Sequence, residues 1–275
     1  MSAMKKLQRK KHAPVMLAGL ILVMMMMYPL RKCSYTPGNI IQMPSGGDTI
    51  DVAIEYAPLS LYRYDDTIGG FDYDMLRELA SKHNLTIKFH PVVSLPRSLE
   101  LISDDVYDIL AANIPVTSEF KENYTFLEPV LLDRQVLVQR RNPETGKGSI
   151  TSQLDLAGDT LWVVDGSSSM SRISNLSHEI GDTIYVNTIP DCSSEQLFIM
   201  TAIGDVKQSV INESVARSLA KDYPDIDIST EISFSQFHSW VISGKRPELQ
   251  DSLNNWIKQY KSTPQYRALT KRYIH

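Results

Sequence analysis

Short apolar runs alternate with segments of helical periodicity over residues 50–112, and this alternation constrains the fold most. The runs TIDVAIEY, LTIKFHPVV and VYDILAAN are rich in β-branched residues and are typical of buried strands. Between the first two, GFDYDMLRELASKHN places Phe71, Met75, Leu76 and Leu79 on one helical face. PRSLELISDD predicts a second helix before the third strand. This order predicts a mostly parallel sheet covered by helices.

The alternation resumes after the turn-rich segment RNPETGKGS. TLWVVDG, TIYVN and VKQSVIN predict strands, and a helical segment follows each of them. The final stretch from FHSWVIS predicts one strand followed by helices that pack back on the first unit. We therefore predict an α/β fold of two lobes with two crossover strands: lobe 1 over residues 50–138 and 233–275, and lobe 2 over 139–232. Such a fold places its ligand in the cleft between the lobes, near the carboxyl ends of the strands.

An uncharged run from Ala13 to Leu30 precedes the globular part, behind five basic residues. As a helix it would span about 27 Å, close to the roughly 30 Å of a hydrocarbon core. It ends in YPLRKC, a poor cleavage site, which favours a retained anchor over a cleaved signal. We predict an anchor or signal over residues 1–32, with a cytoplasmic N-terminus, and a stalk over 33–49. The globule would lie on the periplasmic face of the inner membrane or, after cleavage, free in the periplasm.

Charge and metal-ligating residues narrow the function classes. Residues 1–32 hold seven of the 28 basic residues and none of the 32 acidic ones, so the remainder carries a net charge of −11. That balance disfavours a nucleic acid partner, which needs a basic face. Cys33 and Cys192 are the only cysteines, and the six histidines show no H-x-x-x-H pair. We expect neither a metal nor a cofactor.

Several segments in the same order resemble a known family. GFDYDMLRELASKHN, YDILAANIPVTSEFKENYTFLEP, RQVLVQRR and GDVKQSVINESVARSLAKDYPDI resemble the extracytoplasmic solute-binding proteins of family 3, the polar amino-acid binders of bacterial ABC transporters. The resemblance covers about residues 50–275 and implies a periplasmic-binding-protein type 2 fold. Within the family, the chain is similar to the N-terminal module of membrane-bound lytic murein transglycosylase F. The sequence stops at TKRYIH, where that module would end, so we do not expect the cleavage activity.

The resemblance also implies where a ligand would be held. In amino-acid binders of this family, a Thr backbone amide and an Arg three residues later hold the ligand carboxylate; the matching positions here are Thr117 and Phe120. A phenyl ring cannot replace a bidentate guanidinium, and the loss should cost at least about 2 kcal/mol for a buried carboxylate. Asn212 matches the acidic residue that takes the ligand ammonium. We therefore predict that a free α-amino acid is not held in the usual way.

Each remaining candidate has an ordinary structural alternative. Arg134 and Arg172 could replace the missing cation or be solvated surface arginines, and the tyrosines and Phe71 could line the cleft or pack in the core. The two serines could cradle an anion or cap a helix, and Asn212 could also be a cap. The full candidate set for ligand binding is Tyr56, Tyr62, Phe71, Asn113, Thr117, Phe120, Arg134, Ser167, Ser168, Arg172 and Asn212.

The function predicted from these features is a non-catalytic, membrane-tethered solute-binding protein that closes on an amino-acid-, peptide- or muropeptide-like ligand. Its expected partners are that small molecule, the inner membrane, and an ABC permease or a peptidoglycan enzyme. A module that has lost its ligand and only binds a partner is one alternative. A periplasmic dehydratase using Glu119 or Asp72 as its acid is another, although no arginine stands ready for an acidic substrate.

Overall fold

The computed structural model describes residues 49–64 and 67–274. The chain divides into two units, Met1–Met43 and Pro44–His275, and all described helices and strands belong to the second. The predicted anchor and all but the last residue of the predicted stalk lie outside the described residues. Within the described part of the chain, no helix combines the length and the apolar character that crossing a membrane requires.

The first sheet confirms the predicted parallel arrangement. Its bounds are β1 (Thr49–Glu55), β4 (Thr86–Val92), β5 (Ile109–Pro115), β6 (Thr125–Phe126), β7 (Leu131–Asp133) and β13 (Gln236–Ile242). The strand order is β4-β1-β5-β13-β6, with β7 also paired to β13. Strands β4, β1 and β5 are parallel, and β13 returns from the C-terminal part to pair antiparallel with β5. This sheet and its helices are called lobe 1.

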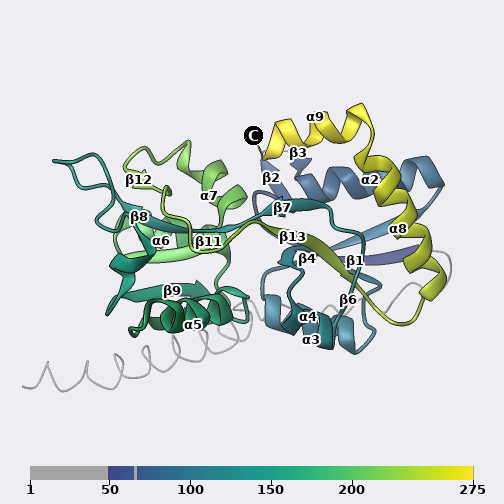
Figure 1. The fold of residues 1–275 in the computed structure, drawn as a ribbon. Coiled ribbons are helices and arrows are strands. Elements are labelled where there is room, and N and C mark those ends of the chain that lie inside the picture. The colour runs from purple at the N-terminus through teal and green to yellow at the C-terminus, as the bar shows by residue number, and fades with distance from the viewer. Residues whose placement is uncertain (1–48, 65–66, 275) are drawn as a thin grey trace, which may run out of the picture. The chain divides into compact units, whose positions relative to one another are not determined.

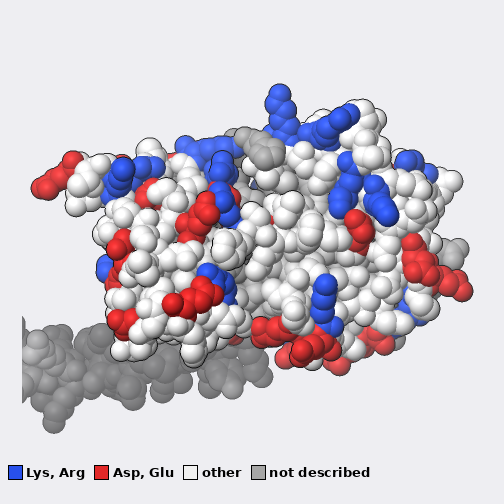
Figure 2. Space-filling view, in the orientation of Figure 1, with Lys and Arg blue, Asp and Glu red and all other residues white. Residues whose placement is uncertain are grey.

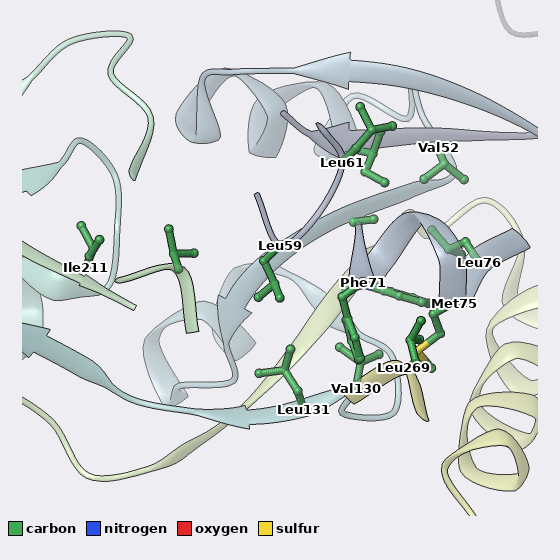
Figure 3. Close-up of a cluster of buried hydrophobic side chains, with 14 of the residues drawn as sticks. Val52, Leu59, Leu61, Phe71, Met75, Leu76, Val130, Leu131, Ile211 and Leu269 are labelled. Carbon is green, nitrogen blue, oxygen red and sulfur yellow. The ribbon is translucent and has the colours of Figure 1, made fainter. Parts of the chain in front are cut away.

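Helices cover lobe 1 through the apolar faces that the sequence predicts. In α2, the predicted stripe residues Phe71, Met75 and Leu76 are fully buried, and Figure 3 shows them pointing into one cluster. Gly70 precedes the helix with φ 142°, and a Cβ there would lie 2.2 Å from the Ser60 carbonyl oxygen, so only glycine fits. Helix α2 spans Phe71–His83. The other elements of lobe 1 are α3 (Leu95–Ser103), α4 (Ser118–Asn123), α8 (Pro247–Lys261), α9 (Pro264–Tyr273) and the hairpin of β2 (Tyr62–Tyr64) and β3 (Thr67–Gly69).

The second sheet repeats the pattern and defines lobe 2. Its strands are β8 (Gln135–Arg140), β9 (Thr160–Val164), β10 (Tyr185–Ile189), β11 (Gln208–Asn212) and β12 (Ile226–Asp227). Their order is β10-β9-β11-β8-β12; β10, β9 and β11 are parallel, and β8 is antiparallel to β11. The helical elements of lobe 2 are η1 (Gln153–Leu156), α5 (Ser169–Ile180), α6 (Ser194–Ile203) and α7 (Glu213–Ala220).

The chain passes between the two sheets twice, as Figure 1 shows around β7, β8 and β13. The first passage is Arg134, between β7 and β8. It precedes the predicted boundary at residue 138, because the whole of β8 pairs with lobe 2, from Gln135 opposite Asn212 onward. The second passage runs from the end of β12 to the start of β13. Both parallel sheets thus bring strand ends and helix starts toward these passages.

Candidate functional site

A small enclosed space, here called the inner cavity, lies between the carboxyl ends of strands from both lobes. Its volume is about 50 Å³, room for a few water-sized groups, since one water needs at least about 10–15 Å³ of such space. The apolar part of the wall includes Leu95, Ile114 and Phe120 of lobe 1 and Val164, Val210 and Val215 of lobe 2. Its polar wall residues are Glu55, Asn113, Gln135, Ser167, Ser168, Ser169, Ser194 and Asn212.

Five of the predicted site residues line this cavity: Asn113, Phe120, Ser167, Ser168 and Asn212. Asn212 precedes α7, but its side chain does not cap that helix. Its Nδ2 instead donates to the backbone oxygen of Asn113 at 3.1 Å, from lobe 2 to lobe 1. The Ser168 hydroxyl likewise makes no capping bond to α5 and accepts from Gln135 Nε2 at 3.0 Å. The capping alternative therefore does not account for either side chain.

Three other candidates have their polar groups engaged elsewhere and do not line the cavity. Thr117 caps α4, since its Oγ1 accepts from the Phe120 backbone N–H at 3.3 Å. The Arg134 guanidinium donates to Glu213 Oε2 at 2.6 Å and also pairs with Glu231. Arg172 donates to the Ile232 backbone oxygen at 2.8 Å and to Glu179 at 2.7 Å. Neither arginine replaces the cation missing at position 120.

The aromatic candidates outside α4 also lie apart from the cavity. Phe71 is fully buried in the core of lobe 1, among the apolar side chains of Figure 3. Its ring lies edge-on to that of Tyr266, with centroids 6.2 Å apart. Its place on the apolar stripe of α2 explains this, because that stripe faces the sheet. Tyr56 is 42% exposed, and Tyr62 is half-buried on strand β2.

The sequence reasoning missed Glu55 and Gln135, both of which line the inner cavity. Glu55 is the last residue of β1, and a carboxylate at the carboxyl end of a buried parallel strand is the signal that identifies such a position. The pKa of Glu55 is raised to about 7, chiefly by burial and also by the charge of Asp72, while the Asn113 backbone N–H acts in the opposite direction. Among the described residues, Glu55 forms no ion pair.

Two amide oxygens in the cavity wall are buried without a hydrogen-bond partner among the described residues: Asn113 Oδ1 and Gln135 Oε1. The Asn113 orientation is fixed, because its Nδ2 donates to Asp133 Oδ2 at 2.9 Å and to the Ser214 hydroxyl at 3.2 Å. Gln135 is less constrained, since the Ser168 hydroxyl can pair with either end of its amide. Buried acceptors are normally paired, so this wall is built to accept hydrogen bonds from something else.

A second space, here called the outer chamber, adjoins the inner cavity through Phe120, Ser167 and Ser168, which line both. Its volume is about 470 Å³, and its charged lining residues are Glu100 and Glu119. Ser171 Oγ of lobe 2 donates to Glu119 at 2.6 Å, while Arg97 pairs with Glu100 at 2.8 Å.

No lysine or arginine lines either space among the residues that the structure describes. Basic side chains do occur elsewhere: Figure 2 shows them mixed with acidic ones over the described surface on the side in view. The lining of the two spaces is thus acidic or neutral although the surface carries both signs of charge.

Comparison with known proteins assigns the chain to a family. The sequence model for bacterial extracellular solute-binding proteins, family 3, matches residues 49–275. The chain is 26% identical over 219 residues to membrane-bound lytic murein transglycosylase F of Aeromonas hydrophila subsp. hydrophila, an alignment that covers 80% of this chain and 42% of that protein. The chain therefore spans less than half the length of this relative. The match confirms the resemblance predicted from the sequence.

Solved structures confirm the two-lobed periplasmic-binding-protein fold. An ancestral arginine-binding protein bound to arginine superposes with a TM-score of 0.71 at 22% identity, covering 83% of this chain and 99% of that one. The substrate-binding protein of an amino acid ABC transporter superposes with a TM-score of 0.69 at 19% identity, covering 82% and 98%. The chain belongs to the bacterial extracellular solute-binding proteins, family 3.

Proposed function

We propose that this chain is a non-catalytic solute-binding domain that closes its two lobes on a small ligand. The observation that carries the proposal is the inner cavity, whose wall comes from both lobes and includes Asn113 and Gln135, each with a buried amide oxygen that has no hydrogen-bond partner among the described residues. Leaving a buried acceptor unpaired costs about 1–3 kcal/mol. A ligand that donates hydrogen bonds removes that cost only when it sits between the closed lobes.

Direct hydrogen bonds between the lobes support closure as the binding motion. Asn212 donates to the Asn113 backbone oxygen at 3.1 Å, and Ser171 donates to Glu119 at 2.6 Å. Each bond joins a residue of lobe 2 to one of lobe 1, and the chain connects the lobes only at the two passages. Hinge closure around a ligand uses this arrangement, with the connecting segments absorbing the rotation.

The ligand in this proposal is not a free amino acid held by its carboxylate. Phe120 supplies an apolar wall where the family's amino-acid binders carry arginine, and the guanidiniums of Arg134 and Arg172 are paired elsewhere. A peptide- or muropeptide-like ligand would place one end in the inner cavity and the rest in the outer chamber of about 470 Å³. The dehydratase alternative gains no support, because Asp72 is 1% exposed and accepts from the Trp240 indole at 2.8 Å.

For the cellular role, we propose an extracytoplasmic domain held near the inner membrane by the predicted anchor over residues 1–32. Two outputs are compatible with the cavity: delivery to an ABC permease, or regulation of a cell-wall enzyme. The alignment with a membrane-bound murein transglycosylase favours the second. A tethered domain also reaches only partners within the length of its predicted stalk.

A ligand-free interaction module is the second candidate. The inner cavity is only about 50 Å³, and the lobes already touch through direct hydrogen bonds. In that case the cleft surfaces would serve only to keep the lobes together, and partner binding would use another face.

Thermal melting of the full chain, purified in mild detergent, against amino acids, dipeptides and muropeptides separates the two candidates. A ligand at 100 times its dissociation constant should add about 2.7 kcal/mol of stability. Gln135→Leu, which removes a cavity acceptor at nearly constant volume, should reduce the shift at least by half. Gln250→Leu on α8, away from the inner cavity and the outer chamber, should leave it intact. No shift with any compound would favour the interaction module.

A further inference from the structure

The charged residues that line the inner cavity and the adjoining outer chamber indicate the charge of the ligand. Glu55 is the ionisable residue of the inner cavity, and Glu100 and Glu119 are those of the outer chamber. Arg97 neutralises Glu100, but among the described residues neither Glu55 nor Glu119 forms an ion pair. Glu119 is exposed on α4, whereas Glu55 is half-buried. A half-buried carboxylate without a cation is disfavoured, and an incoming cation would provide its counter-ion.

The polar groups around Glu55 suit an ammonium group better than any other common group. Asn113 Oδ1 cannot turn away, because its Nδ2 is held by Asp133 and Ser214. Gln135 lies in the same wall, but its amide can turn, so Asn113 Oδ1 is the fixed acceptor. An ammonium carries three donors and no acceptor, so a carboxylate and a fixed amide oxygen suit it.

Phe120 extends the same preference. It lines both spaces, and no guanidinium or ammonium accompanies it among the described lining residues. An aromatic face attracts a cation, whereas it offers a carboxylate nothing. Phe120, which stands where the family's amino-acid binders carry an arginine, therefore also forms a wall against which an alkylammonium can pack.

We propose that the inner cavity holds an aliphatic ammonium group whose neighbouring carbon bears no carboxylate, with Glu55 and Asn113 as its acceptors. This inference rests on the proposed solute-binding function and specifies the ligand class for that site. Two sources provide such a group: a free amine or diamine, and the N-terminus of a short peptide, where an amide replaces the carboxylate. In either case the outer chamber takes the remainder of the molecule.

The exclusion of a carboxylate follows from the same geometry. In a free amino acid the carboxylate lies one carbon from the ammonium, so placing one at Glu55 brings the other into the cavity wall. That wall holds a negative Glu55 and no cation among the described residues. An unpaired carboxylate in this space should weaken binding by at least about tenfold relative to the matched amine.

Two matched pairs of probes test the proposal on the full chain at pH 7.5. n-Propylamine and L-2-aminobutyrate differ by one α-carboxylate, and glycinamide carries a neutral amide where glycine carries its carboxylate. Titration calorimetry and melting should show the carboxylate-free member of at least one pair binding at least about tenfold more tightly than its partner. Preference within the propylamine pair indicates a free amine, and preference within the glycinamide pair indicates a peptide N-terminus.

Glu55→Gln tests whether the bound amine uses the proposed acceptor. It should weaken amine binding at least about tenfold, while Glu122→Gln, on the exposed side of α4 and away from both spaces, should leave it unchanged. The proposal is overturned if neither pair shows tighter binding of its carboxylate-free member, if no amine binds, or if Glu55→Gln binds the amine like the wild type. Binding of another compound from the screen would then leave the solute-binding function standing, whereas no binding at all would remove both.

Discussion

Two glutamates near the lobe interface have opposite electrostatic surroundings. Glu55 ends β1 in lobe 1 and lines the inner cavity, and burial raises its pKa to about 7. Glu213 begins α7 in lobe 2 and lines a groove on the surface. Burial also disfavours its charge, but hydrogen bonds from Arg134 at 2.6 Å and Arg217 at 2.6 Å outweigh burial and lower the pKa of Glu213.

The contrast shows that this protein can supply arginines to a partly buried glutamate and does not do so in its cavity. At Glu213 the counter-ions belong to the fold, so that carboxylate contributes to stability. At Glu55 the charged form is disfavoured in the free protein, and Asp72, buried nearby with a pKa raised to about 6 by burial, adds to the penalty. Destabilised groups of this kind are frequent at binding sites, where the ligand provides the missing interaction.

The largest expected effect is on the stability of the ligand-free chain when Glu55 is replaced by glutamine. The folded-state pKa of Glu55 is raised from 4.5 to about 7, so the native state keeps a proton that the unfolded state has released. The contribution of Glu55 to the free energy of unfolding is therefore fully present below pH 4.5. It decreases by about 3 kcal/mol as the pH rises through about 7. Glu55→Gln should match the wild type at pH 4 and exceed it by about that amount at pH 8, as measured by urea unfolding.

Two features of the same experiment keep it specific. The remaining pH dependence from Asp72 should persist in the variant and lie at lower pH, because the pKa of Asp72 rises only from 3.8 to about 6. Ser168→Ala in the lobe 2 wall removes no titrating group, so its stability, although lowered by the loss of the bond from Gln135, should change with pH as the wild type does. Equal stabilities of Glu55→Gln and wild type at pH 8 would contradict the assignment of Glu55 as a carboxylate without a counter-ion.

A second variant would give the cavity the cation that Glu213 already has. Phe120→Arg combined with Asn212→Asp restores the family's two charged groups, one in each lobe. A charge-assisted pair for the ligand carboxylate should contribute about 2 kcal/mol, or about 30-fold in affinity for a free amino acid such as L-glutamine. Titration calorimetry measures the gain, with Asn212→Asp alone as the control that lacks the guanidinium. Tight binding of the same amino acid by the wild type would show that Phe120 does not prevent it.

The sequence predicted the architecture well because strand and helix patterns are local. The stripe Phe71, Met75, Leu76 and Leu79 is buried as expected, and each predicted strand is present in the two sheets, which combine parallel and antiparallel pairs. The β2–β3 hairpin was not predicted, since its strands are only three residues long and lack a clear alternation. Short irregular strands depend on tertiary context more than on propensity.

The site was predicted less completely, for reasons that concern side-chain partners. Asn113, Phe120, Ser167, Ser168 and Asn212 line the cavity because strand ends and helix starts meet there. Sequence alone could not decide whether Arg134 and Arg172 were available, because their partners Glu213, Glu231 and Glu179 lie 7 to 97 residues away along the chain. Glu55 was overlooked although its position at the end of a buried strand was visible in TIDVAIEY.

The smallest expected effect is the change in stability when Glu213 is replaced by glutamine. Because its folded-state pKa is lowered, Glu213 contributes stability that is present above pH 4.5 and is lost as pH falls through the folded value. Glu213→Gln should therefore destabilise the chain by about 1 kcal/mol at pH 8, a figure reduced by the exposure of Arg217, and should converge with the wild type at acidic pH, below the lowered pKa of Glu213. Urea unfolding at both pH values measures it, with Glu122→Gln on α4 as an exposed control. Glu55→Gln and Glu213→Gln would then change stability at pH 8 in opposite directions although both remove one negative charge. If both variants shifted the free energy of unfolding at pH 8 in the same direction, net charge rather than local ion pairing would determine both effects. The inference that Glu55 is a carboxylate without a counter-ion would then fail.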